Sequence, residues 1–132
     1  MKFTFKKRHN THDDDCWCDA ISLMTNKEYD KVYKMFKPFI EYDGGVNTDI
    51  IVGYFKKENY DVYKMKESLQ NVLRLYNIKN GAVLLMEDKD KNNHAVYIKG
   101  NKIYDNIDSD MMWWYIKEYT VLHIIIKLEF YD

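Results

Sequence analysis

The chain has 132 residues, enough for one domain spanning 1–132 whose core buries roughly two-thirds of the unfolded surface. Its 20 Lys and Arg nearly balance 21 Asp and Glu, and the net charge of −1 argues against the broad basic surface that nucleic-acid binding usually requires. A hydrophobic content of 46% excludes the composition of a disordered chain and predicts a packed core.

The first half of the chain is predicted to be mainly helical. A short alternating strand at 3–5 and a polar loop precede a helix that begins near Cys16, and the acidic residues before it suit the positive end of that helix. Thr25 and Glu28 have the spacing of a capping box, which predicts a second helix that Pro38 ends.

Two further helices are expected after the Gly-rich break at 43–45. Thr48 is the predicted cap of the third helix, and apolar spacing over 69–76 predicts the fourth. Between these two helices, 60–65 alternates only weakly, so it gives no clear strand signal.

The second half changes to the period of strands. The apolar run 82–86 predicts a buried strand, and 95–98 and 102–104 flank Gly-Asn at 100–101, a strong hairpin signal. A last strand is expected at 121–130. Helices followed by strands predict an α+β fold in which N-terminal helices pack on a C-terminal antiparallel sheet.

The sequence also predicts no membrane partner. Its longest apolar run, 121–126, is interrupted by His123 and is far shorter than the roughly 18 to 20 residues that cross a bilayer. The stretch 1–8 alternates and turns basic instead of forming an apolar signal segment. We therefore expect a cytoplasmic protein in which Cys16 and Cys18 stay thiols, because one intervening residue is too few for a relaxed disulfide.

Three residues form a candidate for nucleophilic chemistry. Cys16 stands at the predicted start of a helix, where a thiol beside a histidine becomes reactive. His94 begins the first strand of the hairpin. With a two-residue turn at 100–101, alternation places His94 and Asp105 on one face and Asn106 on the other. Asp105 is therefore predicted to orient the imidazole of His94.

Two segments resemble the small papain-like cysteine peptidases. Within that family they are most similar to the bacteriocin-processing (double-glycine leader) peptidases and to small phage-encoded papain-like proteins. DCWCDAISLMT at 15–25 is similar to their nucleophile helix, in which Asp-Cys opens a helix of the form Asp-Cys-Gly-x-x-Ala-Leu. NHAVYIKGNKIYD at 93–105 is similar to their second block, in which His opens a strand and Asp or Asn closes the next.

The resemblance implies a papain-like fold with a cleft between helices and sheet. It implies a cysteine peptidase-like hydrolase that cleaves a peptide or isopeptide bond, with Cys16 as nucleophile, His94 as base and acid, and Asp105 as the third member. Asn10 stands where the family usually has Gln, and is implied as an oxyanion-hole donor. A phage accessory protein, acting on a host or viral protein in the host cytoplasm, would suit this reading.

Two departures from the family pattern leave an alternative open. Trp17 replaces the usual Gly and can narrow or shield the cleft, and the shorter Asn10 moves the amide donor back by about a methylene. Either change is compatible with an intact fold and weakened turnover. The alternative is a catalytically inactive papain-like module that binds a protein partner through the cleft, with Trp17, Trp113 and Trp114.

A small zinc-binding protein is a further, weaker alternative. His9, His12, Cys16 and Cys18 are four zinc-competent residues within ten positions. The single residue between the two cysteines is shorter than the spacing that zinc knuckles use, so we expect no metal and no cofactor. Cys18 lies on a different side of the helix from Cys16 and is expected to pack.

Two other segments are expected near the cleft. The run MMWWY at 111–115 is interpreted as core or cleft wall, with a partner surface as the second interpretation. The polar loop at 88–93 stands just before His94 and, by the same resemblance, is expected to border the cleft.

Overall fold

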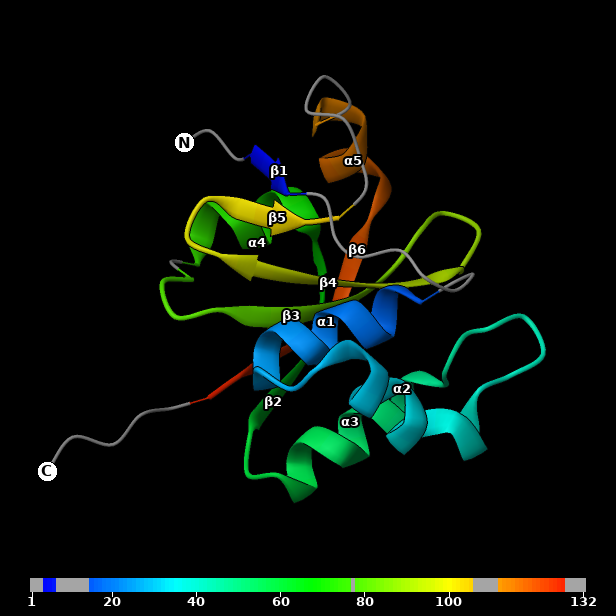
Figure 1. Ribbon diagram of the computed structural model, residues 1–132. Helices are drawn as coiled ribbons and strands as arrows, with labels where there is room; N and C mark the ends of the chain where they lie inside the picture. Colours follow the sequence, from blue (N-terminus) through cyan, green and yellow to red (C-terminus); the bar gives the residue numbers. More distant parts are fainter. Residues whose placement is uncertain (1–3, 7–14, 77, 106–111, 128–132) are drawn as a thin grey trace, which may run out of the picture.

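A computed structural model describes residues 4–6, 15–76, 78–105 and 112–127. Helices predominate in the N-terminal part and strands in the C-terminal part, which confirms the α+β class (Figure 1). The elements are, in order, β1 (Thr4–Lys6), α1 (Cys16–Thr25), α2 (Tyr29–Phe36), the 3-10 turn η1 (Lys37–Phe39), α3 (Thr48–Lys57), β2 (Asp61–Ser68), α4 (Leu69–Leu75), β3 (Ala82–Glu87), β4 (Asn93–Lys99), β5 (Lys102–Tyr104), α5 (Met112–Glu118) and β6 (Thr120–Ile126).

The described strands form one sheet in the order β1-β5-β4-β3-β6-β2. The strands from β5 to β2 pair antiparallel, and β1 joins the edge beside β5 in a parallel orientation. The predicted hairpin is confirmed, because Lys99 pairs with Lys102 across the two-residue turn between β4 and β5. This register fixes which side chains of the two strands share a face of the sheet.

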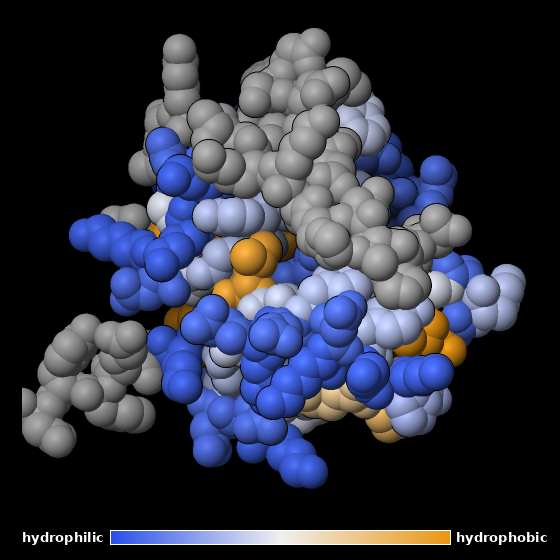
Figure 2. Space-filling view, viewed as in Figure 1, coloured by the Kyte–Doolittle hydropathy of each residue, from blue (hydrophilic) through white to orange (hydrophobic). Residues whose placement is uncertain are grey.

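Helices cover both faces of the sheet (Figure 1). On one face, Leu85 and Ala95 pack in a core with residues of α1, α2 and α3. On the other, Leu84 and Val96 pack in a second core with residues of α4 and α5. Both faces of β3 are therefore buried, which explains why 82–86 is apolar at every position instead of alternating. The outer surface drawn in Figure 2 is mostly hydrophilic, with small, separate hydrophobic spots.

Two predicted helix caps are wrong. Helix α1 continues through Thr25, whose hydroxyl donates to the carbonyl oxygen of Ile21 at 2.7 Å, and Glu28 is itself the cap residue of α2. The capping box therefore does not form. At α3 the cap is Asn47, whose side-chain oxygen accepts from the amide of Asp49 at 2.8 Å, one residue before the predicted Thr48.

Two elements were not predicted as such. The weak signal at 60–65 belongs to β2, an edge strand that pairs with β6 alone among the described strands. Helix α5 contains part of the 111–115 run, whose adjacent bulky residues show no helical period on their own. The last strand, β6, covers the first part of the predicted 121–130, and 128–130 lie outside the described residues.

The second core offers a matched test of packing. Leu84 is fully buried in the central strand β3, whereas Leu75, at the end of α4, is 65% exposed. We expect Leu84→Ala to lower the free energy of unfolding by about 2–5 kcal/mol, because it removes buried methyl groups and leaves a cavity. Leu75→Ala is expected to change it by less than about 0.5 kcal/mol. Urea unfolding measures both values, and equal losses would contradict this placement of β3.

Candidate active site

Cys16 is the first residue of α1 and is partly exposed. It lines a cavity of about 600 Å³ between α1, α3 and the strands β3 and β4. The first amide groups of a helix have no partner within the helix and make this end electropositive, an environment that favours a thiolate. The start of α1 therefore places a potential nucleophile at an open cavity.

Asp15, just before Cys16, is buried and does not cap the helix with its side chain. Its carboxylate accepts instead from the hydroxyl of Tyr29, on α2, at 2.7 Å. Asp15 thus occupies the N-cap position of α1 without making a capping hydrogen bond with its side chain. The Tyr29 bond ties the residue before the nucleophile to a second helix and fixes where α1 begins. Asp13 and Asp14 lie outside the described residues.

The structure brings His94 and Asp105 together, as the hairpin register predicts. Nε2 of His94, at the start of β4, lies 2.6 Å from Oδ2 of Asp105, just after β5. Both side chains are largely shielded, with 19% and 5% of their surface exposed. An ion pair screened from water in this way holds an imidazole more firmly than an exposed one does.

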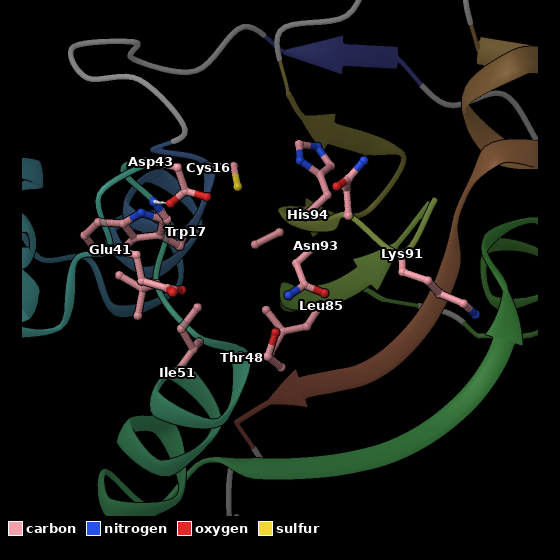
Figure 3. A pocket seen from close by; sticks show the side chains of 14 residues that line it. Cys16, Trp17, Glu41, Asp43, Thr48, Ile51, Leu85, Lys91, Asn93 and His94 are labelled. Atoms are coloured by element: carbon pink, nitrogen blue, oxygen red, sulfur yellow. Dashed lines mark hydrogen bonds between the residues drawn. The ribbon is translucent and has the colours of Figure 1, made fainter. Parts of the chain in front are cut away.

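His94 also forms a hydrogen bond with Cys16. Burial alone would lower the pKa of His94, but hydrogen bonds to Asp105 and Cys16, with the charges on both, outweigh it and raise the pKa to about 10. Figure 3 shows the Cys16 sulfur and the His94 ring facing each other at one end of the cavity. The imidazole is thus placed to hold a proton beside the sulfur.

Two tyrosines, Tyr115 in α5 and Tyr119 just after it, complete the surroundings of this pair. The hydroxyl of Tyr115 donates to Oδ2 of Asp105 at 2.8 Å, and the ring of Tyr119 stacks on His94 at a centroid distance of 5.2 Å. Neither tyrosine was predicted from the sequence to belong to the site. The spacing of four between Tyr115 and Tyr119 is the signal that would have placed them on one helix face near the end of the Asp105 strand.

Trp17 lies in the wall of the cavity, with only 2% of its surface exposed. Its ring stacks on Tyr33, at a centroid distance of 5.8 Å, and packs on Phe36. Its Nε1 donates to the carbonyl oxygen of Gly44 at 2.9 Å. In the alternative of a binding module Trp17 takes part in a partner-binding cleft; the structure has it buried in the cavity wall, where it joins α1 to the turn after η1. Trp114 is 48% exposed, and the side chain of Trp113 lies outside the described part.

The turn held by Trp17 forms one wall of the cavity. Ile40 and Val46 pair across it as an isolated bridge, and the amide of Glu41 donates to the carbonyl oxygen of Gly45 at 2.8 Å. Glu41 and Asp43 line the cavity on this side. In Figure 3 both lie on the same side as Trp17, across from His94 and Asn93.

The polar loop at 88–93 contributes the opposite wall, as expected. Asp88 accepts from the amides of Asp90 and Asn92, both at 2.9 Å, which closes a tight turn before β4. Lys91 and Asn92 line the cavity, and Lys91 pairs with Glu87 at 3.1 Å. The lining also includes the apolar side chains of Ile51 and Leu85.

Of the other candidate residues, three lie outside the described residues and one is buried in the core. Asn10, the expected oxyanion-hole donor, lies outside the described residues, as do His9 and His12. Cys18 is fully buried, its thiol donates to the carbonyl oxygen of Tyr29, and burial raises its pKa. Within the described ranges, no group of three or more His, Cys, Asp or Glu residues is placed to hold a metal ion.

Comparisons with known proteins assign no relative. No protein-family model matches the chain, and no curated protein matches its sequence. In the part of the chain that the structure describes, every helix is too short and too polar to cross a membrane. A functional assignment therefore depends on the geometry of the site.

The contacts of His94 with Asp105 and Cys16 make the free energy of unfolding fall as the pH rises. The pKa of His94 is 6.5 in its ordinary state and about 10 in the fold. Because the folded protein holds this proton more tightly, the contribution to stability is complete below pH 6.5 and is lost as the pH rises toward 10. We expect the difference in unfolding free energy between wild type and His94→Gln to shrink over that range in urea titrations. A difference that grows with pH would contradict this assignment.

The Trp17 bond to Gly44 can be tested with a conservative aromatic change. Trp17→Phe keeps an aromatic ring but removes the indole donor and part of a core side chain, and is expected to cost about 2–4 kcal/mol of stability. Hydrogen exchange at the amides of Glu41 and Gly44, which bond within the turn, should become faster. Trp114→Phe, a change at a half-exposed ring, serves as the control. Unchanged exchange in Trp17→Phe would show that the indole does not hold the turn.

Proposed function

We propose that the protein is a thiol hydrolase of the papain-like type that cleaves a peptide or isopeptide bond. The observation that carries the proposal is the continuous contact from Cys16 through His94 to Asp105, three residues from α1, β4 and the end of β5. Catalytic triads are recognised by this arrangement on unrelated folds: a base contacts the nucleophile, and a carboxylate orients the base.

The arrangement of elements supports the same proposal. Helix α1 packs on β4 and β3, so that its first residue meets the first residues of β4 at the rim of the cavity. A nucleophile on a helix and a base on a facing antiparallel sheet, in the order Cys, His, Asp, is the layout that the sequence resemblance implies. The cavity between them is the proposed cleft for the substrate chain.

Acyl transfer at this site would proceed in two balanced steps. The Cys16 thiolate attacks the carbonyl carbon of the substrate and forms a C–S bond. His94 then gives its proton to the leaving amine as the C–N bond breaks. Water next attacks the resulting thioester while His94 accepts a proton, the C–S bond breaks, and a carboxylic acid leaves with the Cys16–His94 pair restored.

The oxyanion formed in each step needs hydrogen-bond donors. The backbone N–H of Cys16, at the start of α1, is one proposed donor, since amides at this end of a helix point toward the site of attack. Asn10 is proposed as the second donor on the basis of the sequence resemblance alone. The mixed polar and apolar lining of the cavity fits a peptide, which presents both amide groups and side chains.

Selective alkylation tests whether Cys16 is activated. We expect iodoacetamide at pH 6 to label Cys16 and leave buried Cys18 unlabelled, because an imidazolium beside the sulfur stabilises the thiolate, whereas a free thiol is mostly protonated at that pH. His94→Gln should slow this labelling at least tenfold, as followed by mass spectrometry. Labelling of Cys16 at an unchanged rate in His94→Gln would contradict the proposal.

Turnover is tested with a peptide library incubated in ¹⁸O-labelled water. New carboxyl termini that carry ¹⁸O should form with wild type and with Cys18→Ala, and be absent with Cys16→Ala. Loss of the base in His94→Gln should reduce their rate of formation by about 10²–10⁴. Absence of any Cys16-dependent cleavage, despite selective labelling, would favour the alternative of an inactive binding module.

A further inference from the structure

One oxygen of Asp105 accepts from two groups at once. Oδ2 lies 2.6 Å from Nε2 of His94 and 2.8 Å from the hydroxyl of Tyr115. Asp105 is 3% exposed and Tyr115 is fully buried, so water has little access to either bond. Tyr115 is therefore in direct contact with the group that controls the proposed base, although it does not belong to the predicted triad.

The position of Tyr115 is fixed by the core. It is the largest fully buried side chain of the described residues, and it packs in the second core, where α5 meets α4. Burial, and then the charge and hydrogen bond of Asp105, raise its pKa far above the ordinary value, so the hydroxyl stays protonated and acts as a donor. The bond to Asp105 is thus a permanent feature of the folded site.

Two donors to the same anionic oxygen weaken each other. Each hydrogen bond stabilises the carboxylate and draws on its negative charge, which leaves less of that charge to stabilise the partner. The effect is large where solvent is excluded, because the effective dielectric is low there. A hydroxyl on Oδ2 therefore lowers the ability of Asp105 to hold a proton on His94.

We propose that Tyr115 is a positioning residue of this site that acts through Asp105: by donating to the oxygen that His94 uses, it limits how firmly the carboxylate holds the imidazolium. The proposal rests on the proposed function, in which His94 must both keep and release a proton. Without such a limit, a buried carboxylate would keep His94 protonated and prevent it from accepting a proton from water during thioester hydrolysis.

Other groups of the described residues also face His94, and the Tyr115→Phe change leaves these in place. They come from α1, from the turn after β3, and from the residues that directly follow β5 and α5. These groups are Cys16, Asp88, Asp105 and the stacked Tyr119. A change in His94 caused by Tyr115→Phe can therefore be assigned to the lost hydroxyl.

Titration of the His94 ring by NMR tests the proposal independently of catalysis. The background is Cys16→Ala, because the thiolate raises the pKa of His94 and its removal brings the titration into an accessible range. Tyr115→Phe should raise the pKa of His94, by about one unit, the size expected for one hydrogen bond to a charged group. Asp105→Asn should lower it, and Tyr115→Phe should then have no further effect.

The sign of the shift distinguishes this role from a structural one. If Tyr115 served only to hold Asp105 in place, Tyr115→Phe would loosen the carboxylate and lower the pKa of His94, as Asp105→Asn does. A fall, no change, or an equal rise in the Asp105→Asn background would each overturn the proposal. Tyr97→Phe, which removes a hydroxyl from a buried tyrosine of β4 farther along the strand, is the control and should leave His94 unchanged.

A second measurement needs no change at Tyr115. In protein labelled with ¹³C at the tyrosine ζ carbon, the Tyr115 resonance should shift as His94 titrates, because both side chains bind Oδ2 of Asp105. A Tyr115 resonance that does not respond to His94 would overturn the proposal even if Tyr115→Phe failed to fold. Neither titration requires turnover. A lack of peptide cleavage would therefore count against the proposed function alone, and a lack of coupling between Tyr115 and His94 would count against this proposal alone.

Discussion

The contact between His94 and Asp105 is the interaction on which the proposed chemistry depends. A carboxylate that is 3% exposed lies 2.6 Å from the imidazole and, together with the Cys16 sulfur, overcomes the cost of burying a cation. The result is a histidine that carries a proton at neutral pH, at the edge of an open cavity. The ring of Tyr119 stacks on His94, and the hydroxyl of Tyr115 donates to the same carboxylate oxygen that the imidazole contacts.

The fold supplies this contact through two rigid supports. In the β4–β5 hairpin, the start of β4 lies beside the residue that follows β5. His94 and Asp105 therefore meet because of the register of the sheet. Helix α1 packs across β3 and β4 and is fixed at its start by Asp15 and its bond to Tyr29. Cys16 thus approaches His94 from a different layer of the molecule, and the cavity forms where the two layers separate.

The sequence predicted the part of the site that depends on local rules. Alternation and a two-residue turn were sufficient to pair His94 with Asp105, and apolar spacing placed Cys16 at the start of a helix. It did not predict the role of Tyr115, because that contact depends on how α5 packs against the sheet. The packing of Trp17 was not predicted for a similar reason: a bulky ring beside the nucleophile suggested a narrowed or shielded cleft or a partner contact, and the ring lies in the cavity wall, packed on Tyr33 and Phe36.

Coupling between Cys16 and His94 is the central claim, and the pKa of His94 with and without the thiol tests it most directly. NMR titration of the His94 ring in wild type and in Cys16→Ala measures this value in both proteins. The account predicts a pKa of about 10 in wild type and a clearly lower one in Cys16→Ala. The same pKa in both would show that no thiolate–imidazolium pair exists, and would contradict the proposed hydrolase.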